Sequence, residues 1–449
     1  MVRWLLVVPA LVAVLLALLK GGAFVVAEGE ATCSGIVPMK SREKTVSIAD
    51  FGGIGDGKTL NTAAFESAIS HIVQQNASGG TLLHIPAGVW LTGAFNLTSH
   101  MTLFLAKDAV IKATQDTSNW PLIDPLPSYG RGRELPGGRY MSLIHGSGLR
   151  DVIITGENGT IDGQGEMWWN MWRQKTLRFT RPNLLELMHS TDVIISNVVF
   201  QDSPFWNIHP VYCSNVVVKN VTILAPYDSP NTDGVDPDSS MNVCIEDCYI
   251  STGDDLVAVK SGWDEYGIAY ARPSSGITVR RVTGSNQFAG IAIGSETSGG
   301  IENVFAENLD IFDSGIGIHI KTNSGRGGFI RNITISDVNL NNVRKALKIS
   351  GKAGDHPDDG YDPNALPVVD GLTIKNVWGV GVRQPGSIQG IKDSPFTHIC
   401  LSNVTLKVNS SREVPWTCAD VSGGALEVQP SPCAELTSVN GVRFCTNAL

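Results

Sequence analysis

A short run of β-branched residues recurs along this chain every two to three dozen residues, and each run ends in Gly, Asn, Asp or Ser. The runs alternate apolar and polar positions, which is the period of a β-strand. They begin at Asp151, Asp192, Asn215, Asn242, Gly276, Ile301, Ile330 and Val369. One strand cannot bury its apolar face alone, whereas many stacked coils form one continuous core. The repeat therefore predicts a parallel β-helix.

Doubly wound α/β proteins are the main alternative for repeated apolar strands, but they need a helix between successive parallel strands. The connections in this region are turn-like, so the solenoid is favoured. The chain has 449 residues, of which 48 are Gly and only 17% are charged. This length is large for one globular core, but a solenoid adds coils without enlarging its core.

No Pro/Ser-rich linker divides the chain after its N-terminal segment, so residues 28–449 are expected to form one domain. Its N-terminal cap region covers residues 45–110, and its cysteine-containing C-terminal tail covers residues 400–449. The apolar spacing of residues 62–75 predicts one amphipathic helix. Such a helix would cover the open edge of the first coil.

The N-terminus carries an apolar run over residues 4–19, with Arg3 before it and Lys20 after it. Ala27 closes a stretch that suits cleavage, so residues 1–27 are expected to be a signal peptide of a secreted, extracellular or cell-wall protein. The alternative is an uncleaved membrane anchor through the same apolar run. Seven glycosylation sequons suit secretion. They begin at Asn76, Asn96, Asn158, Asn220, Asn332, Asn403 and Asn409.

Eight cysteines are consistent with an oxidising compartment. They include no Cys-X-X-Cys pair and have no nearby histidines at metal-ligand spacing, which argues against zinc. The four C-terminal cysteines are expected to cross-link the last coils and the tail. Cys244 and Cys248 are expected to flank a strand, and their partners stay open. Some of the eight could instead be buried apolar residues.

The formal net charge of −9 argues against nucleic acid as a partner. It does not exclude an acidic polysaccharide, because a polyanion needs local cations in a cleft rather than a basic protein as a whole. We expect a monomer.

Three aspartates stand out within the repeat, namely Asp233 in Asn-Thr-Asp-Gly and the pair Asp254 and Asp255 in Gly-Asp-Asp. Asp233 and Asp254 are 21 residues apart, about one coil. Coils stack about 4.7–4.9 Å apart, so these side chains would be neighbours on one wall. Neighbouring residues of a regular strand point to opposite faces, so Gly253 predicts a bend that lets both members of the pair face the same side. A lone aspartate would more simply be a turn former or a Ca²⁺ ligand, whereas this cluster suits acid/base cleavage of a glycosidic bond.

Four segments, in this order, resemble the polygalacturonases, the pectinase family of inverting glycoside hydrolases, and the plant members are the most similar. The segments are Asn231-Thr-Asp-Gly-Val-Asp-Pro, Thr252-Gly-Asp-Asp-Leu-Val-Ala-Val-Lys-Ser-Gly, Gly290-Ile-Ala-Ile-Gly-Ser-Glu and Gly317-Ile-His-Ile-Lys-Thr. The similarity extends from Asp50 to about Cys400. It implies a right-handed, single-stranded parallel β-helix that hydrolyses α-1,4-galacturonosyl bonds of pectin without a metal or other cofactor.

The resemblance also implies roles for the aspartates. Asp254 is the general acid that protonates the leaving oxygen, and Asp233 and Asp255 hold and deprotonate the attacking water. Inversion places the acid and base carboxyls about 6.5–9.5 Å apart, which leaves room for that water. Clustered like charges raise one another's pKa, which would keep the acid protonated. Lys321 supplies a cation for a substrate carboxylate, and Asn231 is assigned to substrate binding with it.

The chain departs from the family pattern at two positions. His319 stands where the family usually has Arg, and residues 288–290 lack the family's usual His. A histidine cannot form the two-pronged contact of a guanidinium with a carboxylate. Lys260 is expected to offset the lost cation as a further substrate-binding residue. His319 lies two residues before Lys321, so it is expected to face the cleft and to offer hydrogen bonds to the substrate.

Arg131, Arg133 and Arg139 in the segment 128–139 are further candidate cations. Taken singly, each of these arginines, like Lys260, is more simply a solvated surface charge. The tryptophans near the second coil are expected to serve packing rather than binding. They are Trp168, Trp169 and Trp172.

Two other functions stay open. The two departures from the family pattern would suit a pectin-binding wall protein with weakened catalysis. A Ca²⁺-dependent pectate lyase is a third possibility, since it too is a β-helix with acidic clusters. The three aspartates together rank the hydrolase first. The sequence does not distinguish endo from exo attack, nor does it identify the pectic polymer.

Overall fold

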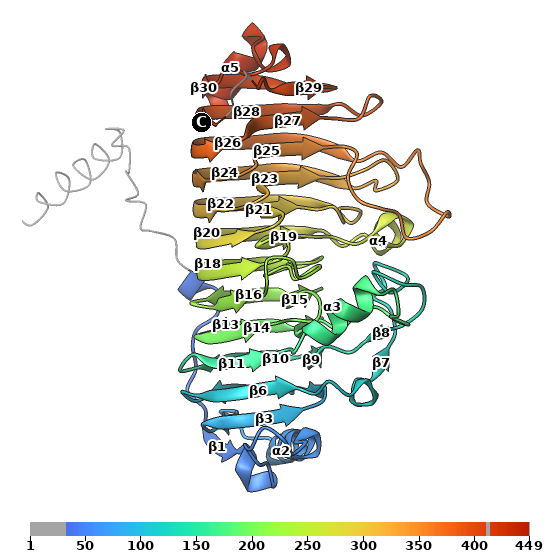
Figure 1. Ribbon diagram of the computed structural model, residues 1–449, viewed down its shortest axis with the longest axis vertical. Coiled ribbons are helices and arrows are strands. Elements are labelled where there is room, and N and C mark those ends of the chain that lie inside the picture. The colour runs from blue at the N-terminus through green and yellow to red at the C-terminus, as the bar shows by residue number, and fades with distance from the viewer. Residues whose placement is uncertain (1–32, 410–413, 449) are drawn as a thin grey trace, which may run out of the picture. The chain divides into compact units, whose positions relative to one another are not determined.

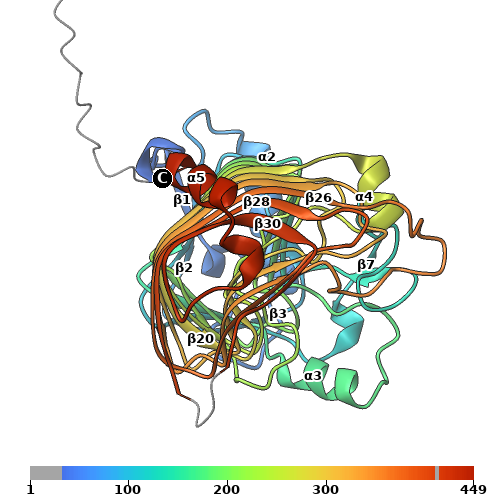
Figure 2. The same ribbon diagram turned by 90° about the horizontal axis from the view of Figure 1, so that it is seen from above.

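The computed structural model describes residues 33–409 and 414–448. Its strands pair in parallel from coil to coil, so the chain winds as a parallel β-helix (Figure 1). Figure 2 looks along the stack and shows the strands of successive coils lying over one another. The doubly wound alternative is wrong, because turns rather than helices join nearly all the successive strands of the described residues.

The strands fall into one large parallel sheet, two smaller parallel sheets and one short antiparallel pair. The large sheet contains β1 (Lys44–Ser47), β2 (Thr81–Ile85), β3 (Gly88–Thr92), β5 (Met101–Leu105), β6 (Ala109–Ala113), β10 (Arg150–Gly156), β11 (Gly159–Asp162), β13 (Thr191–Ser196), β14 (Val198–Gln201), β16 (Ser214–Lys219), β17 (Thr222–Leu224), β18 (Met241–Thr252), β20 (Ser274–Asn286), β22 (Ile301–Phe312), β24 (Phe329–Asn341), β26 (Val368–Val382), β28 (Phe396–Val408) and β30 (Val421–Gln429). The smaller parallel sheets are β4 (Phe95–Asn96), β9 (Ile144–Ser147), β12 (Leu185–Met188) and β15 (Ile208–Val211), and then β19 (Val257–Val259), β21 (Ala289–Ile293), β23 (Ile316–Lys321), β25 (Lys345–Ser350), β27 (Gln384–Gln389) and β29 (Thr417–Ala419). The antiparallel pair is β7 (Leu122–Ile123) with β8 (Arg139–Tyr140).

The core is built from aliphatic side chains that repeat at the same place in each coil. One such column runs through nine coils of the large sheet, and each member is in register with the next. Its members are Val152, Val193, Val216, Val243, Ile277, Val304, Ile333, Leu372 and Ile399. None of these side chains is more than 1% exposed, which explains why the sequence repeats β-branched residues.

The Asp or Asn that opens several of the repeats lies at a corner of the coil. Asp192, Asn215 and Asn242 all have positive φ, a left-handed conformation that Asn and Asp tolerate better than most residues. Their side chains form a ladder from coil to coil. The Asn215 side chain donates to Asp192 at 2.9 Å, and the Asn242 side chain donates to Asn215 at 2.7 Å. The corners therefore need these residue types for both backbone conformation and hydrogen bonding.

Helices lie at the ends and on the side of the stack. Helix α2 spans Thr62–Gln75, the range that the apolar spacing predicts, and lies at the N-terminal end of the coils (Figure 1). The cap region also contributes true coils, because β5 and β6 pair with β10 and β11. The other helices are α3 (Glu166–Arg173), α4 (Asp264–Tyr270), α5 (Val439–Ala448) and the 3₁₀ helices η1 (Cys33–Gly35), η2 (Ile48–Phe51), η3 (Thr117–Asn119) and η4 (Ala434–Leu436).

Three disulfides join N- or C-terminal segments to the coils. Two of them join C-terminal cysteines, as expected, and they are Cys400–Cys445 and Cys418–Cys433. The third joins Cys33 to Cys244. Cys244 and Cys248 lie within β18 rather than on either side of a strand, which corrects that expectation. Cys213 and Cys248 are buried free thiols.

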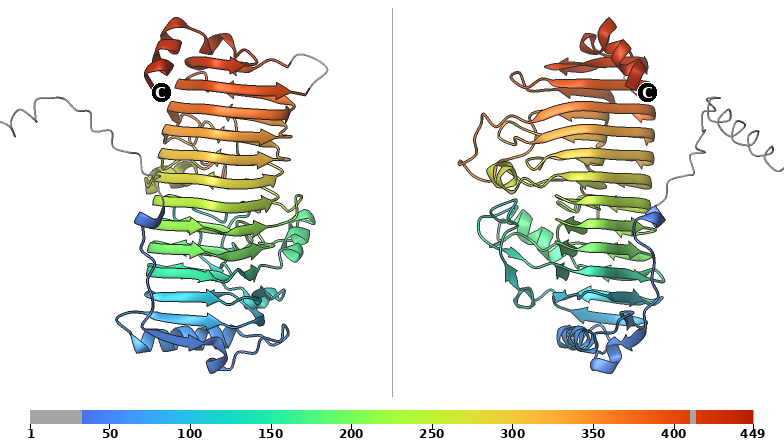
Figure 3. Two further views of the ribbon diagram at one scale, coloured as in Figure 1. Left: turned by 90° about the vertical axis from the view of Figure 1, so that its left-hand side faces the viewer. Right: turned by 180° about the vertical axis from the view of Figure 1, so that it is seen from behind.

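Several elements project from one side of the stack. Helices α3 and α4, the β7–β8 pair and the long connection between β25 and β26 all lie on this side (Figures 1 and 3). Residues 1–27, the expected signal peptide or anchor, lie outside the described residues. Among the helices that the structure does describe, none has the length and apolar character needed to cross a bilayer.

Candidate active site

The three aspartates meet on the face formed by the smaller sheets. Val235 forms parallel bridges with Ile208 of β15 and Val257 of β19, so the segment after Asp233 continues this face between the two strands. One carboxylate oxygen of each aspartate lies within 4.8 Å of one oxygen of each of the others. These nearest-oxygen distances are shorter than the about 6.5–9.5 Å expected between the acid and base carboxyl groups of an inverting enzyme, so that separation is not found between the nearest oxygens. The winding therefore brings Asp233, Asp254 and Asp255 together.

Gly253 allows this arrangement by ending a strand in a bend. Strand β18 stops at Thr252, and the next residues form a bend rather than a ladder. A Cβ at Gly253 would overlap the carbonyl oxygen of Ser229, so only glycine fits there without a backbone shift. Within the bend, the amide of Asp255 donates to Oδ1 of Asp254 at 2.8 Å. The consecutive carboxylates thus approach the same site.

Asp255 is held as an anion. It is fully buried, and it accepts from Nζ of Lys321 at 2.7 Å and from the amide of Ala289 at 2.8 Å. Burial alone would raise the pKa of the Asp255 carboxyl, but the adjacent Lys321 ammonium holds this pKa below its usual value.

Asp254, in contrast, has an environment that favours its protonated form. It is half-buried and lines a cavity of about 390 Å³. Burial, and then the negative charges of Asp233 and Asp255, raise the pKa of the Asp254 carboxyl well above its usual value. Burial also raises the pKa of Asp233, although the charge of Lys260 opposes that shift. The site therefore holds one carboxyl that favours its protonated form beside one that favours its ionised form.

The cavity is lined by Asp233 and Asp254 but not by the buried Asp255, and it combines charges with aromatic rings. Its lining consists of Arg133, Glu134, Trp172, Phe205, Trp206, Asn231, Asp233, Asp254, Lys260, Ser295, Glu296, Lys321 and Asp355. Cations and aromatic faces together can bind the carboxylates and the ring faces of an acidic sugar.

Lys260 lies deep in this lining and is not a solvated surface charge, so that simpler reading is wrong. It is only 3% exposed, and its Nζ lies 3.5 Å from oxygens of Asp233, Asp236 and Glu296. Its Nζ is also 4.5 Å from the centre of the Trp206 ring. Burial would lower the pKa of Lys260, but the surrounding carboxylates raise it well above its usual value. Lys260 therefore compensates buried negative charge within the site.

Asn231 contributes to the same wall. Its side-chain amide lies 3.5 Å from Oδ2 of Asp254, and its Oδ1 accepts from Arg181 at 2.9 Å. Its φ of 55° places it in the left-handed region. Asn231 is thus fixed with its amide directed toward the proposed acid.

His319 lies outside the cavity lining, in contrast to the expected cleft-facing position. It is 8% exposed and lies in register between Ala292 and Lys348 on adjacent coils, whose side chains share its face. Burial, and then the charge of Lys321, lower the pKa of His319 to about 3, so the ring is neutral near neutral pH. His319 therefore does not replace the cation that the family usually has.

Several residues of the site were not predicted from the sequence. Glu296 and Asp236 are buried beside Lys260, and both lie inside segments that resemble the family. Trp172 was expected to serve packing, but it is 42% exposed and lines the cavity, whereas Trp168 and Trp169 are buried. The helical spacing of α3 does not signal this difference, because Trp168 and Trp172 are four residues apart and lie on the same side of the helix.

The three arginines of the segment 128–139 differ in their position relative to the active-site cavity. Arg133 lines the active-site cavity and pairs with Glu296 at 2.7 Å and with Asp355 at 3.1 Å. Arg131 does not line that cavity. Arg139 is buried and binds both oxygens of Glu186 at 2.7 and 2.8 Å, so it too is not a surface charge.

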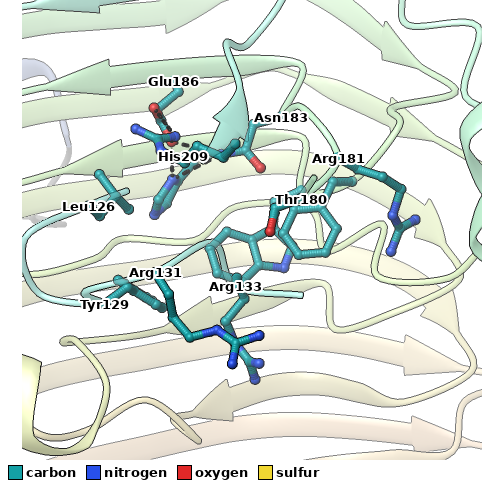
Figure 4. Close-up of a pocket in the computed structure, with 12 residues that line it drawn as sticks. Leu126, Tyr129, Arg131, Arg133, Thr180, Arg181, Asn183, Glu186 and His209 are labelled. Carbon is teal, nitrogen blue, oxygen red and sulfur yellow. Dashed lines mark hydrogen bonds and ion pairs between the residues drawn. The ribbon is translucent and has the colours of Figure 1, made fainter. Parts of the chain in front are cut away.

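Glu186 belongs to a second, buried polar cluster beside the cavity. Figure 4 shows Glu186 and His209 together in this pocket, with Arg131 and Arg133 at the other end. His209 bridges Glu186 at 2.9 Å and Asp238 at 3.2 Å, and the Tyr129 hydroxyl donates to Asp238 at 2.6 Å. These hydrogen bonds hold the buried side chains of this cluster in place beside the active-site cavity.

Comparisons with known proteins agree with the fold. Residues 132–429 match the family described as glycosyl hydrolases family 28. A probable polygalacturonase from Vitis vinifera is 51% identical over 400 residues, covering 89% of this chain and 82% of that protein. An exopolygalacturonase from Thermotoga maritima superposes with a TM-score of 0.73 at 28% identity, covering 88% of this chain and 95% of that one. A polygalacturonase from Erwinia carotovora ssp. carotovora shares the fold, with a TM-score of 0.66 at 23% identity over 86% of this chain and 97% of that one.

Proposed function

This chain belongs to glycosyl hydrolases family 28, and from that premise we propose that it hydrolyses α-1,4-galacturonosyl bonds of pectin by a single displacement with inversion. Membership makes it a glycoside hydrolase of the polygalacturonase, or pectinase, type. The observation that carries the finer proposal is a pair of consecutive carboxyls in opposite environments: Asp254 lines the cavity with a pKa that burial raises, and Asp255 accepts from Lys321, whose charge lowers the pKa of Asp255.

In the proposed reaction, Asp254 donates its proton to the glycosidic oxygen as the bond from that oxygen to the anomeric carbon breaks. Asp233 and Asp255 hold a water molecule and accept one of its protons as its oxygen forms the new bond to the anomeric carbon. Positive charge develops on the sugar ring in the transition state, and the negative charge carried by the carboxylates of the site stabilises it. The products are two shorter chains, one with a new reducing end.

The lining suits an acidic sugar. Lys321 and Arg133 present positive charge to the cavity, and Trp172 and Trp206 present aromatic rings. A galacturonosyl unit carries one carboxylate and apolar ring faces, so it can use both kinds of contact. We propose pectic polygalacturonate as the substrate and secretion to the cell wall as the location, since three disulfides suit an oxidising compartment.

Lys321→Met is expected to move the acidic limb of the activity profile to higher pH. The reason is that Lys321 holds the pKa of Asp255 below its usual value, so removing the ammonium raises that pKa. The ionised base is then lost at a higher pH as the solution is acidified. Measuring kcat across pH for wild type and variant tests this, and an unshifted acidic limb would show that Asp255 is not the group that must be ionised.

One assay tests the proposed function against its alternatives. Purified protein is incubated with polygalacturonate, and both reducing ends and unsaturated, ultraviolet-absorbing ends are measured with and without chelator. Hydrolysis yields reducing ends alone, unaffected by chelator. Unsaturated ends that vanish with chelator would instead indicate a lyase that uses the three aspartates as Ca²⁺ ligands. Tight binding of oligogalacturonides without turnover over a wide pH range would indicate a pectin-binding wall protein.

A further inference from the structure

Four basic side chains lie together on the coils that follow the aspartates. We call them the cation strip, and they are Arg344, Lys345, Lys348 and Arg383. Arg344 and Arg383 are exposed, and the two lysines are half-buried. All four lie in β25 or directly before β25 or β27, on the face that carries the active site.

The strand register connects the strip to the candidate active site. The amide of Ala289 donates to Asp255, Ala289 is in register with Ile316, and Ile316 with Lys345. Lys345 is in register with Gln384, so Arg344 and Arg383 directly precede residues of one column. Arg344 and Arg383 thus lie in the same column of chain positions as Asp254, which directly precedes Asp255. At about 4.8 Å per coil, they lie roughly 14 and 19 Å along the stack from that residue.

The charges of the strip have no carboxylate partner among the described residues. Nζ of Lys345 donates to Oγ of Ser387 at 3.0 Å, and no side chain of the strip lies within ion-pair distance of an Asp or Glu in that part of the chain. Burial, and then the neighbouring Lys348 and Arg344, lower the pKa of Lys345. In a protein of net charge −9, such mutual repulsion is a cost that an anionic ligand would relieve.

The strip also borders a second cavity with the chemistry of an acidic sugar site. This cavity has a volume of about 270 Å³, and both guanidinium groups line it. Its other lining residues are Tyr227, Asp313, Ser314, Gly315 and Asn342. The one carboxylate, Asp313, accepts from the side chain of Asn342. Tyr227 is 52% exposed and lies four residues before Asn231 of the active-site cavity in the sequence.

We propose that the cation strip is an accessory binding site for the galacturonate chain, which holds carboxylates several sugar units away from the bond that is cleaved. Arginine suits this role, because its planar fork matches a carboxylate. This inference rests on the proposed function, since it assigns the strip to the same polyanionic substrate. The strip increases affinity for long chains and leaves the chemical step unchanged.

The test compares Arg344→Gln/Arg383→Gln with wild type on galacturonate oligomers of increasing length. The variant should lose about fivefold in kcat/KM on long oligomers, through KM, with the activity on the shortest cleaved oligomer unchanged. High salt should abolish the difference, because it screens exposed charges. The matched control is Lys375→Gln/Lys407→Gln, which removes the same charge from β26 and β28 of the large sheet and should behave as wild type.

A binding experiment tests the same inference without requiring turnover. Calorimetric titration of a long oligogalacturonide into Asp254→Asn, with and without the two arginine substitutions, should show weaker binding when the arginines are absent. Equal affinity, or equal kcat/KM at every chain length, would overturn the strip as a substrate site. An inactive wild type that still binds through the strip would reject the proposed hydrolysis and leave the inference standing. An equal loss on short and long oligomers would show an effect on the catalytic site and would also overturn the inference.

Discussion

Asp254→Asn is expected to lower kcat on polygalacturonate by about a thousandfold. Asn has nearly the same shape but cannot donate the proton that the leaving oxygen needs. Asp254 is the carboxyl that lines the cavity with a pKa raised by burial and by its two acidic neighbours, so no other group in the site is equally placed to replace it. Initial rates of reducing-end release measure the loss.

The matched control for this substitution is Asp228→Asn, which changes an exposed aspartate near the site that pairs with Arg173 at 3.1 Å. This control should retain wild-type activity. In denaturant unfolding, both variants should have the wild-type free energy of unfolding to within about 0.5 kcal/mol. Wild-type activity in Asp254→Asn would exclude Asp254 as the general acid.

Lys260→Met is expected to cost about 3–5 kcal/mol of unfolding free energy at neutral pH. The substitution keeps the length of the side chain but removes the cation that lies 3.5 Å from the buried acidic groups Asp233, Asp236 and Glu296. Glu296 is the one of the three whose pKa is held well below its usual value, so it is left as a buried anion. Denaturant unfolding of variant and wild type measures the difference. The control Lys107→Met, at an exposed lysine, should stay within about 0.5 kcal/mol of wild type.

The cost of Lys260→Met should shrink as the solution is acidified. Lys260, with Arg133, holds the pKa of Glu296 well below its usual value despite burial. Ionised Glu296 therefore stabilises the wild-type fold above its unfolded pKa, and this contribution is lost as pH falls through the folded pKa. In the variant the carboxylates protonate more readily, so the two proteins converge at low pH. A cost below 1 kcal/mol at neutral pH would show that Lys260 does not compensate these carboxylates.

The fold could be predicted because each coil repeats the same short sequence pattern. Each coil places an aliphatic residue in the same column, as Val193 and Val216 do, and an Asp or Asn at the same corner, so the period is visible in the sequence itself. The clustering of the aspartates could also be predicted from the sequence. The spacing of Asp233 and Asp254 matches one coil, and Gly253 marks the bend directly before Asp254 and Asp255.

The rest of the site depends on contacts that sequence spacing does not reveal. Lys260 and Glu296 are 36 residues apart and meet only because of how the intervening coil and turn fold. The side chain of His319 follows the alternation of its strand, but neighbouring coils cover it, and a single strand does not show its neighbours. Burial against adjacent coils is therefore the property that was missed in both cases.

The configuration of the first sugar product tests the central claim most directly. Wild-type protein is mixed with α-linked oligogalacturonide, and proton NMR follows the anomeric signals before mutarotation equilibrates them. Direct attack by water activated by Asp233 and Asp255, with Asp254 as the acid, predicts that the β-anomer of the new reducing end appears first. Initial appearance of the α-anomer would require a covalent intermediate on one of the carboxylates and would contradict the account.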